Sequence, residues 1–270
     1  MSQTTAAAPI LTHSVGAVRV ITLNRPAALN SFTAAMHALL LPALEAAATD
    51  SAVRAVIVTG TGRGFCAGQD LSDGMSNDAS LQKTAPDVGA LIERLYRPLA
   101  MRVRSMPIPV LAAVNGVAAG AGANFALCCD LVIAARSASF IQAFSKIGLI
   151  PDCAGTWLLP RLIGRAKAMG YAMTGEKMPA VEAERLGLIW QCVDDAALMD
   201  SALALATRLA AMSPRALAET RRTLDASSTL DFSDALTLEA NAQRELGRGH
   251  DFPEGVAAFF AKRPPNFTDR

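Results

Sequence analysis

Short apolar runs alternate with stretches of helical spacing in the first half of the chain, and turn-forming residues separate them. The spacing from Thr33 to Thr49 predicts a helix with Thr33 as its N-cap, and the small residues of 120–129 predict another. Runs rich in β-branched or small apolar residues predict strands at 15–23, 54–60, 109–116 and 131–135.

Strands and helices follow one another at short spacing, which favours parallel strands joined by right-handed crossovers. After Pro160 the pattern becomes mostly helical, and Ser213 before Pro214 is typical of an N-cap followed by proline at the first helical position. The sequence therefore predicts an α/β core over 1–200 and a helical region over 201–270. The amphipathic segments of the second half are 195–212, 214–225 and 233–246.

Composition and charge narrow the class of protein. Of the 270 residues, 51% are hydrophobic, and the net charge is only +1, which gives no field that favours nucleic acid or an anionic membrane. The longest apolar stretch, 110–129, is broken by glycines and asparagines, which disfavours a membrane span. The start, MSQTTAAAPI, does not resemble a secretory signal, so we expect a cytoplasmic protein.

The cysteines show no CxxC spacing and have apolar neighbours, so we expect buried thiols in a reducing compartment. They are Cys66, Cys128, Cys129, Cys153 and Cys192.

The three histidines, which lie far apart in the sequence, offer no metal-ligand spacing, and we predict no metal site. No GxSxG or GxxxxGK[ST] motif occurs, and the glycine-rich turns at 60–65 and 116–124 lack the third glycine of a dinucleotide-binding turn.

Two segments with small side chains could expose backbone N–H groups. RGFCAGQD (63–70) and NGVAAGAGAN (115–124) each follow a predicted strand, and the second opens a predicted helix. Free N–H groups at a helix start favour a negative oxygen, and two converging donors would make an oxyanion hole. Close packing of helix on strand requires the same small residues. Both interpretations stay open at this point.

Asp152 is the third candidate feature. It lies in an apolar segment, GLIPDCAGTW (148–157), between two glycines. An aspartate in such a turn is typical of a helix N-cap, and it is also suited to be a buried catalytic carboxylate.

Together these segments resemble the crotonase, or enoyl-CoA hydratase/isomerase, family over nearly the whole chain. The resemblance implies an α/β fold with a spiral core of ββα units and a C-terminal helical region that forms trimers or paired trimers. Within the family, 143–170 is similar to isomerases that act on the ring epoxide of phenylacetyl-CoA. The motifs that carry the resemblance are NRPAALNSF (24–32), GRGFCAGQDL (62–71), PVLAAVNGVAAGAG (109–122), CDLVIAARSASF (129–140) and EGVAAFFAKRPPNF (254–267).

The resemblance implies that the N–H groups of Gln69 and Ala121 form the oxyanion hole. The usual GGG is here GAG, and alanine can keep the role of a backbone donor as long as its φ is negative. The resemblance also implies residues that bind CoA or substrate. These are Arg25, Ala28, Leu29, Ala67 and Asp70 for CoA, Phe144 and Trp157 for the acyl group, and Phe259 and Lys262 for a neighbouring subunit's ligand.

The sequence departs from the hydratase branch at two positions. Hydratases of the family place a glutamate where this chain has Asn124, which we also expect near the substrate, and another where it has Phe144. Adding water across a double bond needs a carboxylate base, so hydration is disfavoured. Asp152 occupies a third family position at which isomerases carry an acid, and the resemblance therefore implies that it is the base. Ile150, with Phe144 and Trp157, would form an apolar pocket that raises its pKa, whereas a following helix start would lower it.

The activity implied is isomerisation of an acyl-CoA thioester, with 2-(1,2-epoxy-1,2-dihydrophenyl)acetyl-CoA as the expected substrate in phenylacetate catabolism. No cofactor is expected apart from the CoA of the substrate. The alternatives are a Δ3,Δ2-enoyl-CoA isomerase, an enoyl-CoA hydratase, and a non-enzymatic crotonase-fold binding protein. The polar segment 72–86 would be either a lid over the acyl pocket or a solvated loop.

Overall fold

The computed structural model describes residues 8–73 and 87–270 of the chain. The segment 72–86, considered above as a lid, lies outside the described residues apart from its first two positions. Among the described residues, no helix is long and apolar enough to cross a membrane.

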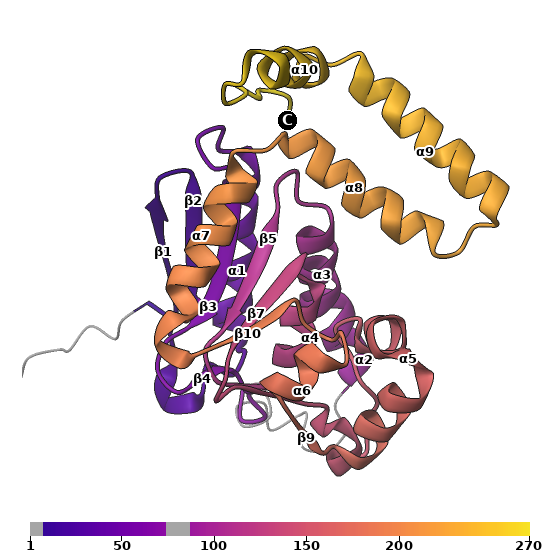
Figure 1. The fold of residues 1–270 in the computed structure, drawn as a ribbon. Helices are drawn as coiled ribbons and strands as arrows, with labels where there is room; N and C mark the ends of the chain where they lie inside the picture. The colour runs from indigo at the N-terminus through magenta and orange to yellow at the C-terminus, as the bar shows by residue number, and fades with distance from the viewer. Residues whose placement is uncertain (1–7, 74–86) are drawn as a thin grey trace, which may run out of the picture.

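A six-stranded sheet forms the centre of the protein (Figure 1). Its order is β1-β2-β3-β5-β7-β10, with β1 antiparallel to β2 and every other neighbouring pair parallel. The parallel pairing predicted from the alternation of strands and helices is therefore confirmed. The strands are β1 (Ile10–Val15), β2 (Val18–Leu23), β3 (Ala55–Gly60), β5 (Val110–Val114), β7 (Leu131–Ala135) and β10 (Gln191–Val193).

A second sheet of short strands continues from the same segments. Its order is β4-β6-β8-β9, in which only β9 runs antiparallel to its neighbour. Because β4 follows β3 and β6 follows β5 after a few residues, the chain turns from one sheet into the other at each repeat, as in a ββα spiral. These strands are β4 (Gly64–Cys66), β6 (Val117–Ala119), β8 (Ser139–Ile141) and β9 (Lys177–Pro179).

Helices cover the central sheet. Strand β5 is buried along its whole length, because the helices α7 and α4 both pack against it. Thr33 caps α1 by accepting a hydrogen bond from the Met36 N–H, as predicted. The helices of the core are α1 (Ala34–Thr49), α2 (Val88–Leu91), α3 (Arg97–Arg104), α4 (Ala121–Cys128), α5 (Gly155–Thr174), α6 (Ala180–Arg185) and α7 (Leu198–Ala210).

The prediction of one strand over 15–23 was wrong. The chain forms a hairpin there, in which Val15 pairs with Val18 across a tight turn. Gly16 has a φ of 56°, which glycine adopts without steric cost, and this glycine inside the apolar run marks the turn.

Three further helices project from the core and give the molecule its extended end (Figure 1). They are α8 (Pro214–Ser227), α9 (Phe232–Gly247) and α10 (Asp251–Ala261). The Ser213 hydroxyl accepts a hydrogen bond from the Ala216 N–H, so the predicted cap of α8 is confirmed. The boundary predicted at residue 200 falls inside α7, which packs on β3, β5 and β7 as part of the core.

Candidate active site

The two small-residue turns meet at the end of the short sheet. A Cβ atom placed on Gly68 would lie 3.0 Å from the Ala119 carbonyl oxygen and 3.5 Å from the Ala121 nitrogen. Gly68 also has a φ of 95°. Both the steric contact and the positive φ therefore require glycine at this position. Because glycine has no side chain, the backbone of 67–69 can approach the start of α4.

This approach brings two unused N–H groups to one place. Among the described residues, neither the Gln69 N–H nor the Ala121 N–H donates a hydrogen bond, although the neighbouring Asp70 N–H donates to the Phe32 carbonyl at 2.9 Å. Ala121 is the first residue of α4, where N–H groups lack helical partners and the helix dipole favours negative charge. The pair has the donors that an oxyanion hole needs.

The GAG sequence fits this geometry position by position. Gly120 has a φ of 51°, and a Cβ atom on Gly122 would lie 2.3 Å from the Cys66 carbonyl oxygen. Ala121, between them, is not among the residues with positive φ, and its side chain is accommodated. The condition that the sequence analysis set for alanine, a φ that is not positive, is therefore met, and the role of its N–H as an oxyanion donor stays a prediction.

Asp152 is half-buried, and one of its carboxylate oxygens is unsatisfied. Within 8–73 and 87–270, its Oδ1 atom is out of contact with solvent and has no hydrogen-bond partner. Burial raises the pKa of Asp152 from 3.8 to about 6, against a smaller opposing effect of its own backbone N–H. The alternative of an N-cap was wrong, because α5 begins after Ala154, whose left-handed backbone opens the helix without any side-chain cap. The carboxylate is thus available for proton transfer near neutral pH.

Tyr96 lies between Gln69 and Asp152 in the network of the site, and the sequence analysis did not predict it. Its hydroxyl donates to Oε1 of Gln69 at 2.6 Å. Its pKa is raised mainly by burial and next by the negative charge of Asp152, so the phenol lies within electrostatic range of the carboxylate. Tyr96 ends a short π-helix, Ile92–Tyr96, and such irregular turns are frequent at functional sites. No motif in the sequence marks this tyrosine.

Asn124 and Phe144 occupy the positions where hydratases carry glutamates. Asn124 is fully buried, and its side-chain amide donates to the Asp152 carbonyl oxygen at 2.8 Å. Phe144 is buried, and its ring lies 3.7 Å from the point where a Cβ atom of Gly120 would be. The structure thus places both beside the site, and it gives Asn124 a contact with the Asp152 turn that the sequence analysis did not anticipate.

The apolar enclosure expected from Ile150 and Trp157 differs from the structure. The prediction was wrong for Ile150, which is 74% exposed. Trp157 stacks under the guanidinium of Arg161, 4.1 Å from the ring centroid, and Arg104 lies on the same ring at 5.6 Å. Burial of Asp152 therefore does not come from Ile150.

The residues expected to hold CoA lie in two adjoining loops. The Ala67 N–H donates to the Leu29 carbonyl at 3.0 Å, immediately after the short 3-10 helix Pro26–Ala28. Arg25 donates to Asp70 at 2.9 Å, and the pKa of Asp70 is lowered by its hydrogen bond to the Ser72 hydroxyl and by that to Arg25. The structure brings all five residues together, and contact with CoA stays a prediction.

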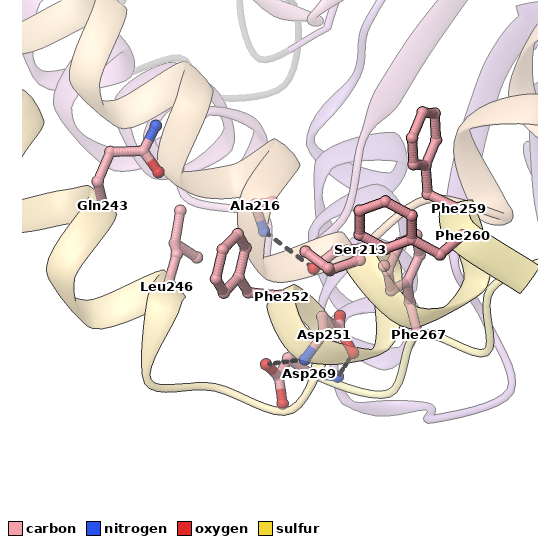
Figure 2. Close-up of a pocket in the computed structure, with 12 residues that line it drawn as sticks. Ser213, Ala216, Gln243, Leu246, Asp251, Phe252, Phe259, Phe260, Phe267 and Asp269 are labelled. Carbon is pink, nitrogen blue, oxygen red and sulfur yellow. Dashed lines mark hydrogen bonds between the residues drawn. The ribbon is translucent and has the colours of Figure 1, made fainter.

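Phe259 and Lys262 lie at the far end of the molecule from α5 (Figure 1). Lys262 follows α10 with a φ of 52°, and Phe259 is 78% exposed. Phe259 is one of four phenylalanines that line a pocket of about 590 Å³ among α8, α9, α10 and the C-terminal tail. Figure 2 shows these side chains. The structure therefore does not bring these two residues to Asp152 of the same chain.

The spiral of ββα repeats, with two small-residue turns packed together at the end of the short sheet, has the architecture of the crotonase fold. The chain belongs to the enoyl-CoA hydratase/isomerase family, whose model matches residues 14–270.

Individual proteins of the family are similar to this chain over nearly its whole length. The chain is 50% identical to the 1,2-epoxyphenylacetyl-CoA isomerase of Escherichia coli strain K12, over 97% of this chain and 98% of the relative. It is 48% identical to a probable enoyl-CoA hydratase of Rhodobacter capsulatus, over 93% and 94%. Its fold matches the crystal structure of a putative enoyl-CoA hydratase/isomerase from Mycobacterium abscessus with a TM-score of 0.89 at 35% identity, over 97% of this chain and all of that one.

Proposed function

We propose that this protein isomerises an acyl-CoA thioester, and that its substrate is 2-(1,2-epoxy-1,2-dihydrophenyl)acetyl-CoA, which it converts to the oxepin. The observation that carries the proposal is the unpartnered Oδ1 of Asp152, on a carboxyl whose pKa is raised to about 6. The 50% identity to an isomerase of this substrate supports the choice of acyl group.

The proposed reaction begins at the thioester carbonyl. Its oxygen accepts hydrogen bonds from the Gln69 and Ala121 N–H groups, which stabilise the negative charge that develops when a neighbouring carbon loses a proton. Asp152 takes that proton and returns it to another carbon, so no atom is gained or lost and a double bond moves. With a ring epoxide as substrate, the same enolate assists opening of the ring to the seven-membered product.

The absence of carboxylates at the two hydratase positions supports isomerisation over hydration. Asn124 and Phe144 cannot act as bases toward water at these positions. The rival activities, Δ3,Δ2-enoyl-CoA isomerisation and hydration, differ from the proposal in acyl group and in the need for that second base. Binding alone does not require a buried carboxylate oxygen without a partner, whereas proton transfer by Asp152 does.

Activity on a panel of thioesters tests the proposal. Epoxyphenylacetyl-CoA mixed with the enzyme should yield a product of equal mass and altered absorbance, and Asp152→Asn should abolish the change while leaving thioester binding nearly intact. Crotonyl-CoA should keep its conjugated absorbance. Rapid loss of that absorbance would favour a hydratase, and turnover of 3-hexenoyl-CoA without turnover of the epoxide would favour a fatty-acyl isomerase.

We also propose that CoA enters only as part of the substrate, and that the enzyme acts in the cytoplasm in phenylacetate catabolism, as a trimer or a dimer of trimers. The cysteines of the described chain are all free, which fits a reducing compartment. Several large apolar side chains on α9 and α10 are uncovered in a single subunit, as expected of a surface that a second subunit covers. These are Phe232, Leu236, Phe252, Phe259 and Phe260. Sedimentation velocity measures the number of subunits directly.

A further inference from the structure

A chain of two side-chain amides leads from β8 to the backbone of the candidate base. Gln142 Nε2 donates to Asn124 Oδ1 at 2.8 Å, and Asn124 Nδ2 donates to the Asp152 carbonyl oxygen at 2.8 Å. Both amide side chains are buried, so these bonds form away from competing water. Each amide has one possible orientation, because Asn124 must donate to a carbonyl and therefore presents its oxygen to Gln142.

The segment that Asn124 holds has a strained backbone. Cys153 and Ala154, the two residues after Asp152, both have left-handed conformations, with φ of 46° and 65°. Such conformations are unfavourable in residues other than glycine and persist only where the surroundings enforce them. The Asp152 carbonyl accepts a second bond from the Gly155 N–H at 2.8 Å, so two donors fix the oxygen at the start of the strained turn.

Close packing adds to the restraint. A Cβ atom on Gly155 would lie 2.2 Å from Asn124 Nδ2, so only glycine lets the turn approach the amide. Asn124 stands three residues after Ala121 on α4, the helix whose start supplies one of the two free N–H groups. A single rigid helix therefore sets the distance between the candidate oxyanion donor and the turn that carries the carboxylate.

We propose that Gln142 and Asn124 are positioning residues that fix the Asp152 turn relative to the oxyanion hole. This inference rests on the proposed function, since it takes Asp152 as the base. A carboxylate in place of the Asn124 amide would face the Asp152 carbonyl as acceptor against acceptor. Position 124 would therefore hold an amide that positions the base in the isomerase, and a carboxylate in a hydratase.

Steady-state kinetics of Asn124→Ala and Gln142→Leu on epoxyphenylacetyl-CoA test the proposal. We expect kcat to fall about 10²-fold in Asn124→Ala and less in Gln142→Leu, with KM within twofold of wild type, because a small displacement of a catalytic group costs rate rather than binding. The pH midpoint of kcat should move below about 6, toward the ordinary value of 3.8, as the loosened turn admits water to the carboxylate. Asn241→Ala, an exposed position on α9, is the matched control and should leave all three quantities unchanged.

Two results would overturn the inference. One is a folded Asn124→Ala or Gln142→Leu enzyme with wild-type kcat. The other is a loss of rate with an unchanged pH midpoint or a proportional rise in KM, because the amides would then act on something other than Asp152. If Asn124→Ala does not fold, Gln142→Leu, which removes only the outer amide, decides alone. Failure of the proposed function is distinguishable, since the wild-type enzyme would then be inactive on the epoxide.

Discussion

The hydroxyl of Tyr96 lies 2.6 Å from Oε1 of Gln69, the residue that supplies one of the two unbonded N–H groups. The aromatic ring is held in turn by edge-on contacts with Phe32 and with His37, at centroid distances of 5.9 and 4.7 Å. A buried phenol thus restrains the loop at one side of the oxyanion hole.

Replacing this phenol should reduce turnover without unfolding the protein. Tyr96→Phe removes one hydrogen bond and leaves the ring packing intact, so we expect a stability loss of about 1 kcal/mol and a fall in kcat of about tenfold. Kinetics and urea denaturation measure the two effects. Tyr171→Phe, at the other tyrosine of the chain, is the matched control, and an equal effect of both substitutions would contradict a specific role for Tyr96.

The pH dependence of the rate should follow Asp152. Burial raises its pKa to about 6, and the base is active only when it is ionised. We therefore expect kcat to rise with pH through about 6 and to level off above about 7. A rate that is already constant between pH 5 and pH 8 would show that another group limits proton transfer.

The same burial should make Asp152 a source of instability at neutral pH. Because its folded pKa lies above the unfolded value of 3.8, stability that is present below pH 3.8 is lost as pH rises through about 6. This difference corresponds to at most about 3 kcal/mol. Asp152→Asn should therefore be inactive and yet more stable than wild type at pH 7.5, by up to that amount, with little advantage at pH 4. Urea denaturation at both pH values measures this, and equal stabilities at pH 7.5 would contradict it.

The elements that the sequence predicted correctly are those whose signals are local. The buried runs gave β3, β5 and β7, and Thr33 marked the start of α1, because burial on two faces and a capping hydroxyl leave traces within a few residues. The hairpin of β1 and β2 was missed because β1, ILTHSV, is exposed at all but its first residue and has no apolar run that would mark it as a strand.

The site could be predicted only in part. The glycine-rich turns and Asp152 were visible as motifs, whereas the bonds that organise them join distant positions. Tyr96 and Gln69 are 27 residues apart, and Asn124 and Asp152 are 28 apart. The direction of the Asp152 pKa shift was likewise undecidable, because it depends on which buried groups surround the carboxylate in three dimensions.

Two adjacent positions in the GAG turn should differ in their tolerance of substitution. Gly122→Ala would place a Cβ atom 2.3 Å from the Cys66 carbonyl oxygen, so the start of α4 must shift. Displacing the Ala121 N–H in this way should cost about 10²-fold or more in kcat. Ala121→Gly restores the glycine triplet common in the family, keeps the same N–H group, and should stay within a few-fold of wild type. Steady-state kinetics of the two variants measure this difference. Equal losses of kcat would show that the turn tolerates no substitution at either position.

Arg221 should be a principal anchor of the projecting helices. Its side chain is only 8% exposed, and its guanidinium donates to the Met106 and Ile108 carbonyls at 2.8 and 3.1 Å. Its Nε lies 2.6 Å from a carboxylate oxygen of Asp130. Burial raises the pKa of Asp130, and the charge of Arg221 opposes that rise. Arg221→Leu leaves this carboxylate without its ion-pair partner, with only the hydrogen bond from the Val110 N–H, and should lower the free energy of unfolding by about 3–5 kcal/mol.

The neighbouring arginine on α8 provides the matched comparison. Arg222 is 64% exposed and pairs with Glu219 one turn away, so Arg222→Leu should cost less than about 1 kcal/mol. Adding Asp130→Asn to Arg221→Leu should recover part of the loss, because the unpaired charge is then removed. Urea denaturation of these three variants and of wild type measures each difference. If Arg221→Leu costs no more than Arg222→Leu, then the buried ion pair of Arg221 with Asp130 contributes nothing measurable to the attachment of α8.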